Sequence, residues 1–489
     1  MNLISIQNLV KTLTNGERKT FSLISGVYGA ENKYYTLYEY LRDNKAIDIE
    51  CLEKNFGKNG LETAKKHLSL TLMKALRYAE NEGTLENKIL NKIMDARIFH
   101  KKGLIAESLD LLSKIKEISL ENELFTYYLM ASRLELEYIS RMQFNGIDEY
   151  GLIEKQNKIE EILKHEMLVR RHSSLFEILM VRYWRKGIVS NLYEKAKLDD
   201  LLLEEYQILN NKNYNSFESQ KLHLNFQSTY FMMIGDPEGS LKIFYEINAL
   251  FKKNMHLSLT SSADYIFMLD GLLTNLRAIN KHDEMPFFIK ELSGICTQSE
   301  DLKTRIAFLI FFHHLTIYNY QQDFKNALIF INENSVLIDQ VLKGPLFNLQ
   351  VQICLAISIS YFGLGNVKKS LFFQNFILNN YKKNYSYRLY FQVRVLYLMT
   401  QFELKNFDYL NYEIKSFERK IKLENKKNVF ENIIIDIFKK LLKEPDNVKN
   451  VLDQILEGLN TSQFSPENQR VVQNLQFNKW LSNFKIKIN

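Results

Sequence analysis

One spacing recurs along this chain and restricts its fold more than any other feature. An aromatic residue is followed four positions later by glycine, and five positions after the glycine comes a small or apolar residue. This spacing is typical of a helix that ends at a glycine turn and is followed at once by a second helix. The clearest copies are Phe99, Gly103 and Ser108; Tyr183, Gly187 and Leu192; Phe231, Gly235 and Ser240; and Tyr361, Gly365 and Ser370.

Weaker copies keep the same register with another residue in place of the turn glycine. From Leu192 onward the second-helix residues follow one another every 40 to 48 residues, and the gap of 84 residues before Leu192 spans two periods, with a poorly formed repeat expected near Gly151. The pattern predicts helical hairpins that repeat about every 43 residues. The weaker copies are Asn280 with Met285, Gln322 with Ala327, Lys405 with Leu410, and Asn447 with Leu452.

The composition agrees with an all-helical chain. Only 5 prolines and 18 glycines occur among 489 residues, so the residues that punctuate sheets and loops are scarce. We therefore expect an all-α fold, an α-solenoid of antiparallel helix hairpins with helical caps at both ends.

The second-helix residue of each hairpin is expected to lie where the two helices cross. Serine or alanine there lets the helices approach closely. An apolar residue four positions later lies on the same helix face and should join the core, and Gln374 is the exception. The apolar residues at this position are Leu112, Ala196, Phe244, Ile289, Ile331, Ile414 and Leu456.

The first clear hairpin resembles the tetratricopeptide repeat, whose small, aromatic, glycine, aromatic and alanine positions are partly matched by Ala96, Phe99, Gly103, Ile105 and Ser108. That family has a 34-residue period, so each helix here would be about one turn longer. The resemblance covers roughly residues 85–460. It implies a superhelix whose first helices line a concave surface that binds an extended or helical peptide.

We predict three parts: residues 1–84, a solenoid of about nine hairpins over residues 85–460, and a C-terminal capping helix in residues 461–489 that starts at Pro466. Residues 1–84 do not keep the repeat. Their expected helices are Thr14 to Val27, Tyr34 to Asn44, Asp48 to Phe56 and Leu61 to Ala79, with a tight turn from Gly57 to Gly60 and Asp48 as an N-cap.

Three interpretations of residues 1–84 stay open: a cap docked on the first hairpin, a protein-docking domain, or a helix-turn-helix DNA contact that uses Lys65, Lys66 and His67. The charge of this part is nearly balanced, with 12 basic and 10 acidic residues, whereas a DNA-binding domain usually has a clear basic face. The net charge of +7 is carried by residues 380–489, where interleaved lysines and carboxylates favour a solvated helix surface over a site for an anionic partner.

Signatures of catalysis and of metal or cofactor binding are missing from the sequence. The phosphate-binding glycine patterns and the nucleophile elbow do not occur. His165 and His172 are seven residues apart, and His313 and His314 are adjacent; neither spacing places two imidazoles on one zinc ion. We expect no enzyme, no cofactor and no metal.

The location follows from cysteine usage and hydropathy. Cys51, Cys296 and Cys354 are far apart, which is compatible with a reducing cytoplasm. The N-terminal apolar run is too short for a signal peptide, and no run approaches a membrane span. A cytoplasmic protein without membrane insertion is expected.

The resemblance also points to residues of a concave groove. Trp184, Arg185 and Arg277 are the strongest candidates, because tryptophan and arginine often dominate binding energy, although Trp184 could instead pack against the next hairpin. The whole set is Arg97, His100, Glu177, Trp184, Arg185, Asn225, Thr229, Asp270, Thr274, Arg277 and Asn319.

The equivalent positions of later hairpins are apolar, which predicts either a hydrophobic peptide groove or an inner surface that the chain buries itself. They are Phe312, Leu355, Ile359, Phe362, Val395, Met399 and Phe402.

The leading hypothesis is a non-enzymatic scaffold that binds a protein or peptide partner through its concave surface. The alternative is a transcriptional or signalling regulator in which residues 1–84 contact DNA or an effector while the solenoid senses a peptide, as in bacterial tetratricopeptide regulators. An enzyme with an unrecognised site is the third.

Overall fold

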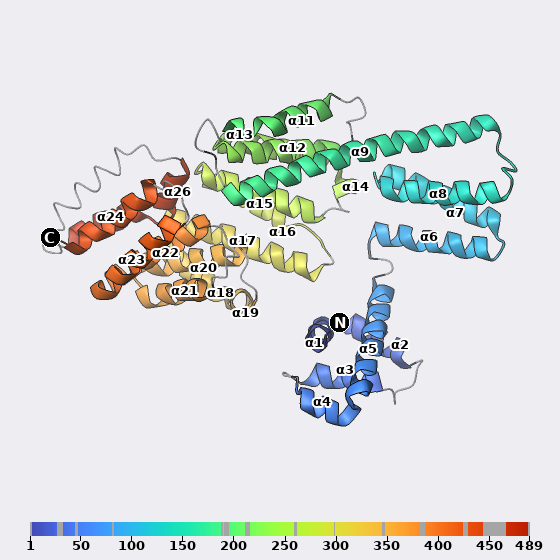
Figure 1. Cartoon of the computed structure of the whole chain (residues 1–489). Coiled ribbons are helices and arrows are strands. Elements are labelled where there is room, and N and C mark those ends of the chain that lie inside the picture. The colour runs from blue at the N-terminus through green and yellow to red at the C-terminus, as the bar shows by residue number, and fades with distance from the viewer. Residues whose placement is uncertain are drawn as a thin grey trace. The chain divides into compact units, whose positions relative to one another are not determined.

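A computed structural model gives the fold of the chain (Figure 1). Every regular element in its described residues is a helix, and no strand occurs among them, so the predicted all-α class is confirmed. The described residues are 2–26, 33–44, 47–80, 83–186, 189, 195–210, 216–258, 262–297, 299–344, 348–380, 387–423, 429–443 and 466–487.

The chain divides into two compact units, residues 1–166 and residues 167–489. The division falls inside one helix, α9 (Glu149–Lys186), which is 38 residues long.

Unit 1 begins with five helices around one apolar core, to which each helix contributes, from Ile6 in the first to Leu72 in the last. Asp48 caps its helix as expected, since its side chain accepts a hydrogen bond from the Cys51 amide. The helices are α1 (Leu3–Thr12), α2 (Asn15–Gly26), α3 (Lys33–Asp43), α4 (Ile49–Phe56) and α5 (Lys58–Ala79).

Two details of this part differ from the sequence prediction. Helix α1 was not expected, because only Leu3, Ile4 and Ile6 stand out as apolar at its start. In the structure Asn2 caps it by accepting from the Ser5 amide, and Ile6 and Val10 form its buried stripe. The turn before α5 is also shorter than expected. It consists of Gly57, with φ 69°, and the helix starts at the next residue.

The rest of unit 1 contains α6 (Leu85–Lys101), α7 (Ile105–Glu121), α8 (Phe125–Arg141) and the first part of α9. Buried Glu135 on α8 connects three of these helices, because it pairs with Lys116 of α7 and with Lys155 of α9. The region near Gly151, where a poorly formed repeat was expected, contains a turn at Gln143 and Phe144, both with positive φ, and then the uninterrupted helix α9.

Unit 2 continues as a succession of helices that pack mainly on helices close to them in the chain. They are α11 (Asp199–Leu209), α12 (Phe217–Met233), α13 (Pro237–Lys253), α14 (Met255–Ser258), α15 (Ser262–Ala278), η1 (His282–Glu284), α16 (Met285–Ser293), α17 (Glu300–Gln321), α18 (Phe324–Glu333), α19 (Ser335–Lys343), α20 (Asn348–Gly363), α21 (Val367–Asn379), α22 (Tyr387–Glu403), α23 (Phe407–Leu423), α24 (Val429–Lys443), α26 (Pro466–Asn474) and α27 (Phe477–Lys487).

The turns between paired helices share one backbone geometry. Six residues that the sequence pattern places at turns all have positive φ: Gly103, Gly235, Asn280, Gln322, Gly365 and Lys405. In each case the amide after the turn residue bonds to a carbonyl five residues earlier, as in Asp236 to Phe231 and Asn366 to Tyr361, which closes the helix end. The predicted turns at Gly187 and Asn447 lie outside the described residues.

The residues expected at helix crossings are buried wherever the structure describes them, and Leu192 and Leu452 lie outside the described residues. Ser108, Ser240 and Ser370 are each 0% exposed, and so are Met285 and Ala327. Each of the three serines also donates its hydroxyl to the carbonyl twelve residues earlier, on the first helix of its hairpin, at 2.8 to 3.0 Å. Small size and a hydrogen bond therefore act together at these crossings.

Two residues differ from the others at the position four residues after the crossing residue, where a buried apolar side chain is the rule. Gln374 is fully buried and bonds through Nε2 to the hydroxyls of Ser358, Ser370 and Thr400. Ala196, which was expected to pack, is exposed; α11 begins only at Asp199, where two carboxylates favour a helix start.

Candidate ligand-binding surface

The first helices of the hairpins share a face that register defines. The first-helix crossing residue lies twelve positions before the second-helix one, and it is buried on α6, α12, α15, α17, α20 and α22, as for Ser228 of α12 and Leu273 of α15. The positions three before, one after and four after that residue form one stripe beside the crossing. We call this stripe the first-helix face.

On α12 and α15 the first-helix face is partly exposed and polar except for Met232. Asn225 and Thr229 occupy it on α12, and Asp270, Thr274 and Arg277 occupy it on α15. The Thr229 hydroxyl lies 3.8 Å from the Met180 sulfur of α9, so α9 borders this part of the surface. Five of the predicted groove residues are thus grouped on two helices.

Contacts link α15 to α17 across the same surface. Asp270 Oδ1 lies 3.1 Å from Nε2 of His313, which is fully buried, and the Arg277 guanidinium is centred 4.8 Å from the Phe312 ring. Burial lowers the pKa of His313, although Asp270 opposes this effect. His313 was not among the sequence candidates. Its 43-residue separation from Asp270, about one repeat, was the signal for this pair.

Arg277 also affects the pKa of a second buried imidazole, that of His282. His282 is 5% exposed and stacks on Tyr320 with ring centroids 3.7 Å apart. Burial, reinforced by the positive charge of Arg277, lowers the pKa of His282 to about 4. His282 is therefore neutral around pH 7, and Arg277 is the cationic group at this end of the α15 face.

The remaining predicted groove residues, on α9 and in unit 1, do not form a group like the one on α12 and α15. Glu177 is exposed and pairs with Arg170 at 3.0 Å, and the side chains of Trp184 and Arg185 lie outside the described residues. In unit 1, Arg97 is exposed, whereas His100 stacks on Tyr138 with centroids 3.7 Å apart.

The first-helix face changes character from α17 onward. Asn319 is 8% exposed and bonds through its side chain to the Ala356 carbonyl and to the Ser360 hydroxyl, so α20 occupies its polar groups. Leu355 of α20 and Met399 of α22 are 4% and 0% exposed. The predicted apolar positions are mostly self-buried, since Phe312, Val395 and Phe402 are buried as well, whereas Ile359 and Phe362 are partly exposed.

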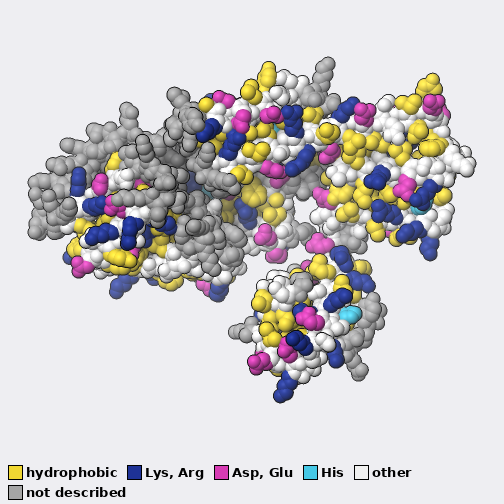
Figure 2. Space-filling view, in the orientation of Figure 1, with side chains coloured by type: hydrophobic (Ala, Val, Ile, Leu, Met, Phe, Trp, Pro, Cys, Tyr) yellow, Lys and Arg dark blue, Asp and Glu magenta, His cyan; other side chains and the backbone are white. Residues whose placement is uncertain are grey.

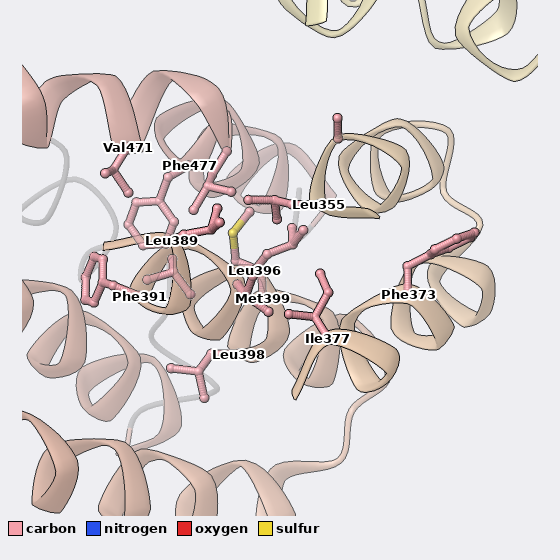
Figure 3. Close-up of a cluster of buried hydrophobic side chains, with 14 of the residues drawn as sticks. Leu355, Phe373, Ile377, Leu389, Phe391, Leu396, Leu398, Met399, Val471 and Phe477 are labelled. Atoms are coloured by element: carbon pink, nitrogen blue, oxygen red, sulfur yellow. The ribbon is translucent and has the colours of Figure 1, made fainter. Parts of the chain in front are cut away.

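The C-terminal segment provides the cover. Figure 3 shows Val471 and Phe477 beside Leu389 and Phe391, in the same cluster as Leu355 and Met399. The segment predicted as one capping helix is two helices, α26 and α27, separated at Gln476, whose φ is 51°. Pro466 is the first residue of α26, as expected.

Three polar contacts hold the same segment. Gln476 Nε2 donates to the Asn319 carbonyl at 2.9 Å, and Lys479 Nζ donates to the side chain of Gln322. Trp480 Nε1 donates to Glu403 Oε1 at 2.8 Å, while its ring packs against Phe402. The segment thus contacts the C-terminal ends of both α17 and α22.

A separate cavity of about 380 Å³ lies at the end of α9. Its one carboxylate, Asp200, forms a two-point ion pair with Arg182, and this contact lowers the pKa of Asp200. Over the part of the chain that the structure describes, no group of three or more His, Cys, Asp or Glu side chains is placed to hold a metal ion. Within the same residues, no helix has the length and apolarity needed to cross a bilayer.

Helix α5 presents a second distinctive surface. It carries five lysines and arginines but one carboxylate, Glu62, which pairs with Lys65 at 2.6 Å. Lys66, Lys74 and Arg77 are exposed. Figure 2 shows Lys and Arg side chains on the part of the surface formed by α1–α5.

Comparison with protein-family models, with curated proteins and with solved structures finds no match to this chain.

Proposed function

We propose that this chain is a non-enzymatic scaffold that binds a protein or peptide partner, and that its hairpins form a tetratricopeptide-like α-solenoid. The observation that carries the proposal is the set of partly exposed polar side chains at one register on α12 and α15: Asn225, Thr229, Asp270, Thr274 and Arg277. Such a surface offers hydrogen bonds and both charges to an extended or helical segment, while the core beneath it keeps the helices rigid.

Partner capture with matched variants tests this function. Thr274→Arg places a large cation on the first-helix face, and Lys242→Glu changes an exposed residue of the second helix α13. We expect proteins captured from a native lysate by the wild-type chain to be lost with Thr274→Arg and kept with Lys242→Glu, at equal melting temperatures. Capture that is indifferent to Thr274→Arg contradicts the proposal.

A regulator that contacts DNA through α5 is the second candidate. It is favoured by the exposed, acid-poor face of α5 and by the tight turn at Gly57 that separates α4 from α5. Fluorescence anisotropy with a random-sequence DNA duplex at low salt tests it. Lys66→Glu with Lys74→Glu should weaken binding at least tenfold and reduce its salt dependence, whereas Lys19→Glu on α2 should have a smaller effect. No binding by the wild-type chain rejects this candidate.

A further inference from the structure

The position of α26–α27 differs from that of an end cap. A capping element of a repeat array covers the last repeat. Here Gln476 and Lys479 contact Asn319 and Gln322, 157 residues earlier. The segment therefore reaches from the end of α17 to α22 and α24, where the Trp480 ring packs against Phe402 and Phe438.

The contacts of α27 indicate which kind of helix the surface beneath it can bind. Phe477, Trp480 and Leu481 form one apolar stripe of α27 and are 1%, 7% and 0% exposed. Gln476 and Lys479, beside that stripe, donate hydrogen bonds to the end of α17, where carbonyl groups and the helix dipole favour donors and cations. We call the surface that α26–α27 covers, which includes Asn319, Gln322, Phe402 and Glu403, the seat. The seat binds an amphipathic helix that has aromatic and aliphatic side chains on one face and hydrogen-bond donors beside them.

We propose that the seat of α26–α27 is a partner site for an amphipathic helix of this chemistry, which the chain occupies with its own C-terminal helices. The proposal rests on the scaffold function and extends it: the polar first-helix face of α12 and α15 stays accessible, and the apolar face of α20 and α22 opens to a partner that replaces α26–α27. Because α26–α27 is part of the same chain, it competes for the seat at a high effective concentration. A partner helix therefore binds weakly until the contacts of α26–α27 are weakened.

A labelled peptide of residues 466–487 tests the proposal on the full chain. Anisotropy is measured with the wild-type chain and with the full-length variant Phe477→Asp/Leu481→Asp, which loses its internal anchors and keeps the seat. We expect the peptide to bind the variant at least tenfold more tightly than the wild-type chain. A peptide that carries the same two aspartates is the matched control and should bind neither protein.

Two further measurements separate the outcomes. If the double variant does not fold by circular dichroism, Trp480→Ala replaces it, with the same expected direction. If a folded variant binds the peptide no better than the wild-type chain does, α26–α27 is a permanent part of the core and the proposal is wrong. Thr274→Arg should leave peptide binding unchanged, because Thr274 lies on the polar face, so failure of this inference is distinguishable from failure of the scaffold function.

Discussion

Single residues at the turns determine how each hairpin closes. The turn position has positive φ whether it holds glycine, as at Gly235, or another residue, as at Lys405 with φ 59°. A side chain with a Cβ is strained in this conformation, by about 1–2 kcal/mol. The weaker copies of the repeat pattern therefore store strain that the glycine copies avoid.

This strain predicts opposite effects of two substitutions at the same turn position. Lys405→Gly should raise the free energy of unfolding by about 0.5–1 kcal/mol, because the exposed lysine loses only its backbone strain. Gly365→Ala should lower it by about 1 kcal/mol, since no atom lies within 4 Å of the added Cβ and strain alone acts. Urea unfolding measures both. Equal signs would contradict the shared turn geometry.

The buried amide of Gln374 allows a second residue-level test. Its Oε1 has no hydrogen-bond partner, whereas the hydroxyls of Ser358, Ser370 and Thr400 also bond to backbone carbonyls. Gln374→Met removes the unpaired oxygen at similar volume and should change stability by less than about 1 kcal/mol.

The matched variant Gln374→Glu buries a carboxyl group that must stay protonated or carry an unpaired charge. It should cost about 3 kcal/mol at pH 7 and less at pH 5, because burial raises a carboxyl pKa and protonation becomes easier at lower pH. Urea unfolding at both pH values checks this. A cost that does not depend on pH would exclude ionisation as its cause.

At the scale of elements, the distance between α13 and α15 depends on a missing side chain. A Cβ added at Gly271 would lie 2.5 Å from the Phe244 ring. Alanine favours an isolated helix over glycine by about 1 kcal/mol, but the clash outweighs this gain in a packed interface. We expect Gly271→Ala to destabilise unit 2 by about 1–3 kcal/mol, measured by thermal unfolding.

The background variant Phe244→Leu supplies the control for this contact. Without the ring, Gly271→Ala should become neutral or stabilising, so the two substitutions should be strongly non-additive. Identical effects in both backgrounds would mean that Phe244 does not determine the sign.

The sequence predicted elements best where local signals are strong. The turn at Gly235 was readable because glycine after an aromatic residue is a short-range signature of a helix end, and the turn at Gln322 followed from the repeat register. The uninterrupted α9 and the break at Gln476 were not, since neither depends on a glycine or proline, and tertiary contacts decide both. The polar group of α12 and α15 followed from register. Its partner His313 and the cover by α26–α27 depend on contacts between distant residues.

Across the whole molecule, buried neutral histidines link stability to pH. The pKa of His282 falls to about 4 in the folded state, against about 6.5 when unfolded, so the unfolded chain binds more protons between these values. His282 therefore does not lower the free energy of unfolding above pH 6.5. As the pH falls from 6.5 toward 4, His282 lowers the free energy of unfolding by at most about 3 kcal/mol.

The variant His282→Gln isolates this contribution. Its melting temperature should vary less with pH than that of the wild-type chain between pH 6.5 and 4, and the two profiles should run parallel above pH 7. His313 contributes in the same direction, because burial also lowers its pKa. Parallel profiles over the whole range would show that His282 titrates alike in both states.

The contact between Gln476 and Asn319 has a consequence for the order of folding. Most helix contacts in unit 2 join neighbours in the chain and can form as synthesis proceeds. The apolar surface of α20 and α22 is different, because its cover is made more than sixty residues after Phe402. A ribosome-bound chain that has reached α24 exposes this surface, so nascent chains at that stage are the ones most dependent on chaperones.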